Sequence, residues 1–166
     1  MSEVEITNDQ KPASRRKEKK LSRSQMRSSS RRLALQAIYQ WQMNQSSINE
    51  IETQFTLDQN MSNCDATYFR ELLQGVTIRA KKLDDLFEKL LDRPLNALDP
   101  IELATMRIGA FELSERLDVP YRVAINESVE LAKGFGATES HKYVNGILDK
   151  LAQRVRREEI AARRNS

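Results

Sequence analysis

The chain has 166 residues, the size of one ordinary domain, and its formal net charge is only +3. Cys64 is the single cysteine, which excludes an intrachain disulfide and a thiolate metal cluster. No stretch approaches the roughly 18 consecutive apolar residues of a membrane span, and the first residues lack the apolar core of a secretory signal. We therefore expect a cytoplasmic protein with no membrane partner.

The positive charge is concentrated at the N-terminus. Residues 1–32 carry ten Lys or Arg against four Asp or Glu, whereas residues 33–166 carry a net charge of −3. Residues 1–26 also contain few large apolar side chains, so burial cannot offset the entropy of ordering them. The sequence predicts a disordered basic arm over residues 1–26. Such an arm suits phosphate backbones, and a merely solubilising tail is the alternative.

Helical periodicity begins after this arm. Gly (5), Pro (4) and aromatic residues (6%) are scarce, which argues against many short strands. Apolar residues from Leu33 to Trp41 follow one helical stripe, and a second stripe runs over residues 65–91. The second stripe predicts one continuous helix. Gly75 is its only weak point and marks either a bend or a close helix crossing.

The next helix has the sharpest predicted start. Asp99 is placed as the cap, Pro100 at the first helical position, and Glu102 where it could return a bond to the cap. We predict a helix over residues 100–116, and its wide apolar arc marks it as the most buried one. Another helix should end near Lys133 with Gly134 as a left-handed cap.

A last helix is predicted over residues 140–157, followed by a frayed polar tail at 158–166. The pattern as a whole predicts an all-α protein, in which a compact helical bundle over residues 27–157 follows the arm. Gly134 and Gly136 follow a helix and not a strand, so they do not form a dinucleotide-binding motif.

The sequence contains no recognisable catalytic constellation. One histidine and one cysteine cannot supply the ligands of a metal site. Paired acids at 84–85 and 158–159 are expected on solvated surfaces. We therefore expect no catalytic residue, no metal and no cofactor, which leaves binding as the class of function to consider.

Two places could bind an anion. Arg27, Arg31 and Arg32 lie in the first turns of the first helix, where positive charge opposes the macrodipole. At the start of the last helix, His141 and Lys142 should be exposed, and Tyr143 half-buried. Tyr143 could stack on a base while Lys142 meets a phosphate. Alternatively, Tyr143 packs at the edge of the core with its hydroxyl in water.

Several stretches resemble a known family. They are "LALQAIYQWQ", "YFRELLQGV" and "VPYRVAINESVELAKGFGATESHKYVNGILDKLA", with arginines just before the first. Over about residues 27–155 the chain resembles the NusB family of bacterial transcription antitermination factors. The resemblance implies two small helical bundles and a noncatalytic RNA-binding role. It further implies binding to the boxA element of ribosomal RNA leader transcripts together with the ribosomal protein NusE, with other Nus factors and RNA polymerase as indirect partners.

The resemblance also implies site residues. The positions carried over to RNA contact are Arg27, Arg31, Arg32, Glu139, Lys142 and Tyr143, and those carried over to the protein partner are Tyr39 and Glu102. Arg32 occupies a place where relatives can carry an acid. Residues 28–30 are serines at places that are often basic in relatives, so the cationic surface is expected to be thinner here.

Two other functions are compatible with this resemblance. One is an accessory RNA-binding module of the ribosomal RNA methyltransferase type, although 166 residues leave no room for a cofactor-binding domain. The other is a purely structural dimerisation module, which would form a concentration-dependent dimer and show no RNA preference.

Overall fold

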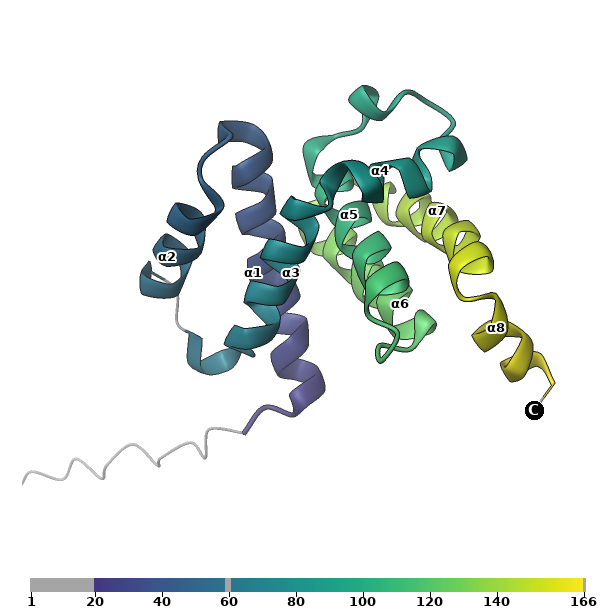
Figure 1. Cartoon of the computed structure of the whole chain (residues 1–166), viewed down its shortest axis with the longest axis horizontal. Helices are drawn as coiled ribbons and strands as arrows, with labels where there is room; N and C mark the ends of the chain where they lie inside the picture. The colour runs from purple at the N-terminus through teal and green to yellow at the C-terminus, as the bar shows by residue number, and fades with distance from the viewer. Residues whose placement is uncertain (1–19, 59–60, 166) are drawn as a thin grey trace, which may run out of the picture.

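The regular elements are all helices in the computed structural model, which describes residues 20–58 and 61–165 (Figure 1). The α-helices are α1 (Arg23–Asn44), α2 (Ile48–Asp58), α3 (Ala66–Ile78), α4 (Ala80–Phe87), α5 (Pro100–Glu115), α6 (Tyr121–Phe135), α7 (Ser140–Val155) and α8 (Arg157–Arg164). The short 3-10 turns are η1 (Met61–Asn63), η2 (Glu88–Leu90) and η3 (Leu95–Ala97). The all-α prediction is confirmed.

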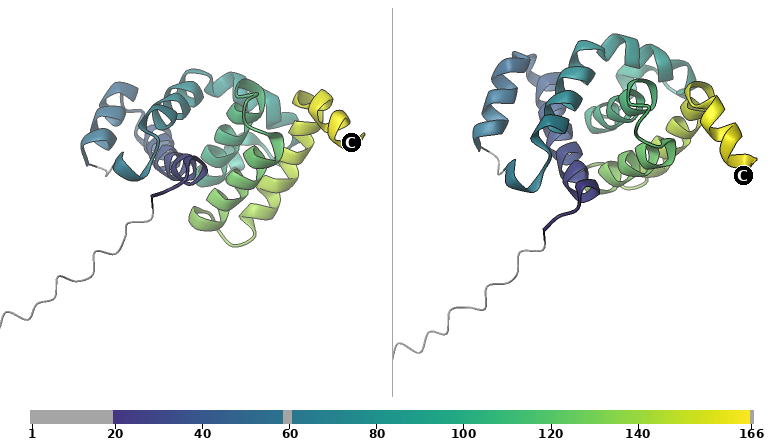
Figure 2. Two further views of the ribbon diagram at one scale, coloured as in Figure 1. Left: turned by 90° about the horizontal axis from the view of Figure 1, so that it is seen from below. Right: turned by 60° about the horizontal axis from the view of Figure 1, so that its bottom comes forward.

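The helices form two bundles that share a boundary. Helices α1, α2 and α3 lie together on the left of Figure 1, and α4 to α7 lie on the right. Helix α1 packs against α3 on one side and against α5 on the other. Figure 2 shows the same arrangement from two further directions. The boundary between the bundles is therefore a packed interface.

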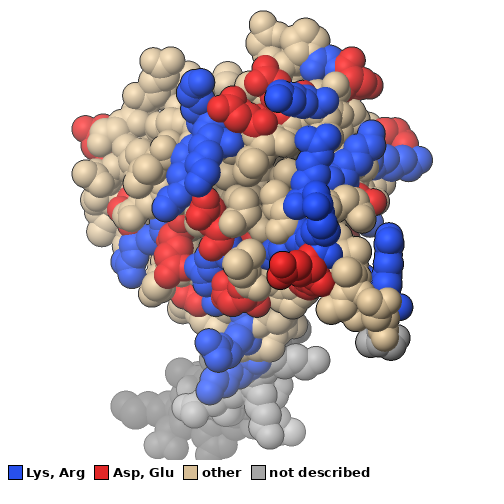
Figure 3. All heavy atoms as spheres, turned by 45° about the vertical axis from the view of Figure 1, so that its right-hand side comes forward, with Lys and Arg blue, Asp and Glu red and all other residues tan. Residues whose placement is uncertain are grey.

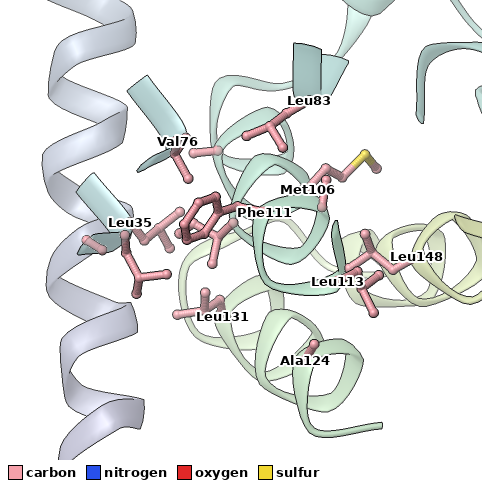
Figure 4. Close-up of a cluster of buried hydrophobic side chains, with 14 of the residues drawn as sticks. Leu35, Val76, Leu83, Met106, Phe111, Leu113, Ala124, Leu131 and Leu148 are labelled. Carbon is pink, nitrogen blue, oxygen red and sulfur yellow. The ribbon is translucent and has the colours of Figure 1, made fainter. Parts of the chain in front are cut away.

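Helix α5 is the centre of the core, as its wide apolar arc predicts. It packs against α1, α3, α4, α6 and α7. Phe111 of α5 reaches toward Leu35 of α1 and Val76 of α3, and all three side chains are buried (Figure 4). Burial of such side chains stabilises the fold by roughly 1.5–3 kcal/mol each.

The first helix begins earlier than predicted, at Arg23 instead of Arg27. Ser22 and Gln25 form a capping box: the Gln25 amide donates to Ser22 Oγ at 3.1 Å, and the Ser22 amide donates to Gln25 Oε1 at 2.9 Å. The prediction missed this pair because residues 22–25 lie within a polar segment. Residues 23–26 of the expected arm are therefore helical, and residues 1–19 lie outside the described residues.

The predicted continuous helix over residues 65–91 is wrong. It divides at Arg79 (φ −105°, ψ 14°) into α3 and α4. Gly75 does not cause the division and instead allows a close crossing, because a Cβ atom there would overlap the Phe111 ring. The change of direction brings Leu83 and Phe87 into the second bundle, where both are fully buried.

Helix α5 has the predicted start, with the Ile101 amide donating to Asp99 Oδ1 at 2.8 Å. Helix α6 does not end at Gly134. It continues to Phe135, and the described glycines all have negative φ. The left-handed conformation occurs instead at Glu139, with φ 74°, immediately before α7. The glycine-cap prediction is therefore wrong.

The expected frayed tail is also wrong over most of its length, because α8 is a helix and Ile160 is buried in the core. Asp84, expected on a solvated surface, is only 8% exposed. Its carboxylate accepts two bonds from Arg107, at 2.8 and 2.7 Å, and Arg107 also donates to Gln42 Oε1 at 3.0 Å. This cluster links α1, α4 and α5. Across the described residues, none of the helices has the length and apolar character needed to cross a membrane.

Candidate nucleic-acid and protein-partner interface

Arg31 lies in the core, which contradicts its predicted place on an RNA-facing surface. It is 2% exposed, and Glu112 of α5 is 0% exposed. Arg31 Nε and Nη2 donate to the two oxygens of Glu112 at 2.8 and 2.7 Å. Burial alone would lower the pKa of Arg31, but the bonds and charge of Glu112 raise it, so the side chain stays charged. Its guanidinium is committed to Glu112 and does not form part of the exposed cationic surface.

Tyr68 completes this buried cluster. Its hydroxyl donates to Glu112 Oε2, and its ring lies beneath the guanidinium groups of Arg27 and Arg31. Burial, followed by the charge of Glu112, raises the pKa of Tyr68, so the hydroxyl keeps its proton. Helices α1, α3 and α5 are thereby joined through one carboxylate.

Arg27 and Arg32 remain accessible on α1. The Arg27 guanidinium carbon lies 4.4 Å from the centroid of the Tyr68 ring, and its Nη1 lies 3.7 Å from Asp118 Oδ2. Arg32 is exposed, and its Nη2 donates to Ser29 Oγ at 2.7 Å. Contacts of this kind are weak at a surface, so a phosphate can replace them.

The serines beside these arginines have structural contacts. Ser28 donates to Glu127 Oε1 at 2.8 Å, and buried Ser30 donates to the Asp65 carbonyl at 2.8 Å. Arg23, which was expected in the disordered basic arm, lies instead in the first turn of α1. It lines a pocket of about 450 Å³ with Arg27, Asp118 and Val123. Arg23 and Arg27 are one turn apart on α1.

The structure brings together some of the predicted residues at the start of α7. Glu139 and Lys142 are both exposed and form an ion pair, with Lys142 Nζ 2.6 Å from Glu139 Oε2. The left-handed backbone of Glu139 places its side chain at the helix start. His141, expected to be exposed, is partly buried. This edge therefore presents one accessible cation next to an acid.

Tyr143 packs at the edge of the core. Its hydroxyl donates to Asp92 Oδ1 at 2.8 Å and accepts from the Asp92 amide at 3.3 Å. The Arg93 guanidinium carbon lies 4.4 Å from the ring centroid. Burial, and then the bond to Asp92, raise the pKa of Tyr143. The structure thus favours the packing alternative in this conformation, with the hydroxyl bonded to Asp92. Asp92 and Arg93 lie far from Tyr143 in the sequence, and their role was missed.

Tyr39 and Glu102 lie beside a largely apolar pocket. The pocket, of about 660 Å³, is lined by Tyr39, Met43, Phe55, Ile101 and Phe135 among others. Glu102 follows Ile101 in the chain. It does not complete a capping box at Asp99, and its Oε2 accepts from Ser140 Oγ at 2.8 Å. Glu102 therefore adjoins the start of α7, whereas Tyr39 lines the apolar pocket.

The predicted RNA residues form two separate groups on the surface. Arg27 contacts Tyr68 and Asp118, whereas Tyr143 contacts Asp92 and Arg93. On the face in Figure 3, basic side chains form separate streaks among acidic and uncharged ones. Among the described residues, no group of three or more His, Cys, Asp or Glu could hold a metal ion. Cations spread in this way suit an extended polyanion better than a compact anionic ligand.

Comparison with known proteins agrees with this architecture. The model of the NusB family matches residues 28–153. A transcription antitermination protein NusB of Marinomonas sp. (strain MWYL1) is 79% identical, over 100% of this chain and 97% of its own length. The NusB of Pseudomonas entomophila (strain L48) is 51% identical, over 93% of this chain and 91% of its own.

Solved structures agree as well. A structure of T. maritima NusB has a TM-score of 0.71 and 26% identity, and the match covers 86% of this chain and 99% of that one. A crystal structure of antitermination factors NusB and NusE in complex with dsRNA has a TM-score of 0.68 and 22% identity, with coverage of 80% and 98%. The family match, the close relatives and the shared fold together establish that this chain belongs to the NusB family.

Proposed function

We propose that this protein is a noncatalytic, cytoplasmic RNA-binding factor of transcription antitermination. It binds single-stranded boxA of ribosomal RNA leader transcripts together with the ribosomal protein NusE, and through that complex it acts with other Nus factors and RNA polymerase. The close relatives named as transcription antitermination proteins support the process, and the solved complex of NusB, NusE and dsRNA supports the two kinds of partner.

One contact carries the proposal of joint binding. Glu102, which follows Ile101 of the Tyr39 pocket in the chain, accepts a hydrogen bond from Ser140 Oγ at 2.8 Å, so the start of α5 is joined to the first turn of α7. A protein in that pocket would lie next to Glu139 and Lys142. RNA held at the start of α7 would then contact both proteins, which increases affinity without any change of shape.

The proposed RNA surface consists of Arg27 and Arg32 on α1, and Glu139, Lys142 and Tyr143 on α7. Arg31 acts behind this surface by holding α1 against α5 through Glu112. The cations meet phosphates and supply affinity, whereas contacts to base edges supply sequence preference. Because Arg93 lies over the Tyr143 ring, a base can stack on that face only after Arg93 moves.

The proposal is tested by titrating labelled boxA RNA, and a scrambled RNA of equal length, at two salt concentrations with and without NusE. We expect preference for boxA at both salt concentrations, and tighter binding when NusE is present. Equal affinities that fall together as salt rises would contradict the proposal, because they indicate attraction to any polyanion.

The role of the apolar pocket is tested in the same assay. Tyr39→Ala should abolish the tightening by NusE while leaving the affinity for RNA alone unchanged, because Tyr39 is 36% exposed at the pocket. Leu57→Ala is the matched control, since Leu57 is exposed but does not line that pocket. A Tyr39 variant that retains the full effect of NusE would exclude this pocket as the partner site.

A further inference from the structure

Helix α8 is firmly docked against the rest of the second bundle. Glu159 Oε1 accepts from the Tyr121 amide at 3.1 Å, and its Oε2 accepts from Arg156 Nη1 at 2.5 Å. Ile160, one residue later, is buried in the core. Arg156 in turn donates to the carbonyls of Leu113, Glu112, Arg116 and Val119 at the end of α5 and beyond. Helix α8 therefore has a fixed position.

This position closes a pocket that lies partly beyond the family match, because that match ends at residue 153 and α8 follows it. The pocket lies between α6, α7 and α8 and has a volume of about 680 Å³. Its polar lining includes Arg122, Asn126, Asn145, Asp149, Arg163 and Arg164. The lining thus includes three guanidinium groups and one carboxylate.

The lining has the chemistry of a phosphate site. Guanidinium groups bind phosphate oxygens through paired N–H donors, and side-chain amides donate further bonds. Arg122 and Arg164 are exposed, on α6 and α8 respectively. The Glu159 carboxylate lies near Arg163, whose charge helps to lower the pKa of Glu159, and it offsets part of the positive charge at the end of α8. A net positive, amide-rich surface favours a polyanion over an apolar ligand.

The pocket is separated from the proposed RNA surface only by the start of α6. Tyr121 and Arg122 line it, while Val119, Pro120 and Val123 line the neighbouring pocket that contains Arg23 and Arg27. The two pockets therefore flank the same five-residue segment, 119–123. A single strand that leaves Arg27 can cross this segment and reach Arg122 and Arg164.

We propose that the α8 pocket binds the phosphate backbone of single-stranded RNA that flanks the boxA segment. This inference rests on the proposed RNA-binding function and extends its footprint to α8, which follows the residues that the family model matches. The site contributes affinity and salt dependence but no sequence preference, because it offers charge and amide donors to the backbone.

The test compares a core boxA RNA with RNAs extended by about six nucleotides on the 5′ or the 3′ side, a length within the usual site sizes of single-strand binding surfaces. The variant is Arg122→Gln combined with Arg164→Gln. The matched control combines Arg70→Gln and Lys81→Gln, which removes the same charge from exposed positions on α3 and α4. Affinities are measured over a range of salt concentrations for each RNA.

One of the extended RNAs should bind the wild type more tightly than the core RNA. For that RNA the double variant should lose the added affinity, and its slope of log K against log salt should fall by about 1.4, since each phosphate contact to a single strand contributes about 0.7. Binding of the core RNA should be unchanged in the variant.

The outcomes separate the two proposals. If the wild type shows no preference for core boxA RNA, the proposed function fails. If core RNA is bound specifically but neither extension adds affinity, the α8 site is overturned. It is also overturned if the double variant and its control weaken every RNA equally, because the effect would then come from overall charge. The α8 site would likewise be overturned if polyglutamate competed for the pocket as well as the extended RNA does.

Discussion

At the scale of single residues, the main finding is that Arg31 and Glu112 serve the fold. The sequence analysis placed Arg31 on the RNA surface because it belongs to a run of basic residues. Its partner lies 81 positions away in the chain and carries no local signal. Only the packing of α1 against α5 shows that the two side chains are buried together, with Tyr68 bound to the same carboxylate.

Glu112→Gln should therefore destabilise the protein strongly. The substitution leaves the buried Arg31 charge with only the partly exposed Glu127 carboxylate, 3.6 Å away, and breaking a buried pair in this way costs about 3–5 kcal/mol. Urea unfolding at neutral pH measures the loss. Arg32→Gln on the exposed side of α1 should change the unfolding free energy by less than about 0.5 kcal/mol. Similar losses in both variants would contradict the structural role of the buried pair.

Tyr143 has a structural contact and a proposed contact with RNA, and two substitutions distinguish them. Tyr143→Phe removes the bonds to Asp92 but keeps the ring, so RNA affinity should be retained. Tyr143→Ala removes the ring, and the affinity for boxA RNA should fall by about 1–3 kcal/mol, the usual contribution of a stacked base. Thermal unfolding of both variants checks that they remain folded. An alanine variant that binds RNA normally would refute base stacking.

At the scale of elements, the sequence predicted most helices because the apolar stripes of α1, α5 and α7 have unbroken helical spacing. It failed where the deciding interaction is tertiary. Helices α3 and α4 carry one continuous stripe, and their division at Arg79 follows from packing against a second bundle. Helix α8 appeared too polar to be ordered, but the burial of Ile160 and the contacts of Glu159 help to fix it. Exposure in the candidate site was predicted in the same uneven way: Arg32, Glu139 and Lys142 are exposed as expected, but Arg31 is buried, and the contacts of Tyr143 with Asp92 and Arg93 were not predicted.

Replacing two of the glycines by alanine should have opposite effects on stability, because only one of them lies at a close helix crossing. A Cβ atom on Gly109 would lie 2.5 Å from a Leu148 methyl group and 2.8 Å from Ser128 Oγ, whereas one on Gly146 would meet nothing within 4 Å. Gly109→Ala combines an overpacking cost of about 1–3 kcal/mol with a gain of about 1 kcal/mol in helix propensity, so we expect net destabilisation of about 1 kcal/mol. Gly146→Ala should stabilise the protein by up to about 1 kcal/mol. Urea unfolding of both variants tests the pair, and a destabilised Gly146 variant would contradict the open environment.

The docking of α8 should depend on pH through Glu159. Burial would raise its pKa, but bonds from the Tyr121 amide and Arg156 lower it below the ordinary value of 4.5. A lowered pKa means that the folded state favours the ionised carboxyl. The stabilisation is therefore complete above the ordinary pKa and is lost as pH falls through the lowered one.

Comparison with Glu159→Gln isolates this effect. The wild type should be more stable at pH 7 by less than about 1 kcal/mol, because the carboxylate is partly exposed and screened by solvent. The difference should disappear in acid. A difference that stays constant from pH 7 to acid pH would show that the carboxylate charge does not hold α8.

At the scale of the whole molecule, the two bundles are one cooperative unit because α1 belongs to the core of both. Leu35 and Ile38 of α1 are fully buried, and the Arg107 cluster links α1 to α4 and α5. The packing of α1 against both bundles could not be inferred from its apolar stripe, because one apolar face does not show how many other helices it contacts. It also has a functional consequence. Arg27 on α1 and Lys142 on α7 keep a fixed separation, which is the geometry that the proposed RNA surface requires.

Trp41, the only tryptophan, can show whether the two bundles unfold together. It lies on α1, and the guanidinium carbon of Arg107 on α5 is 5.9 Å from its ring centroid. Its fluorescence reports the boundary between the bundles, whereas far-ultraviolet circular dichroism reports all helices. We expect the two signals to give coincident urea transitions, as in two-state unfolding. Asp84→Asn weakens the Arg107 cluster and should lower both midpoints equally, without changing the slope of either transition. A Trp41 transition that precedes the loss of helicity would show that the bundles separate before they unfold, and the fixed separation of Arg27 and Lys142 would then no longer follow.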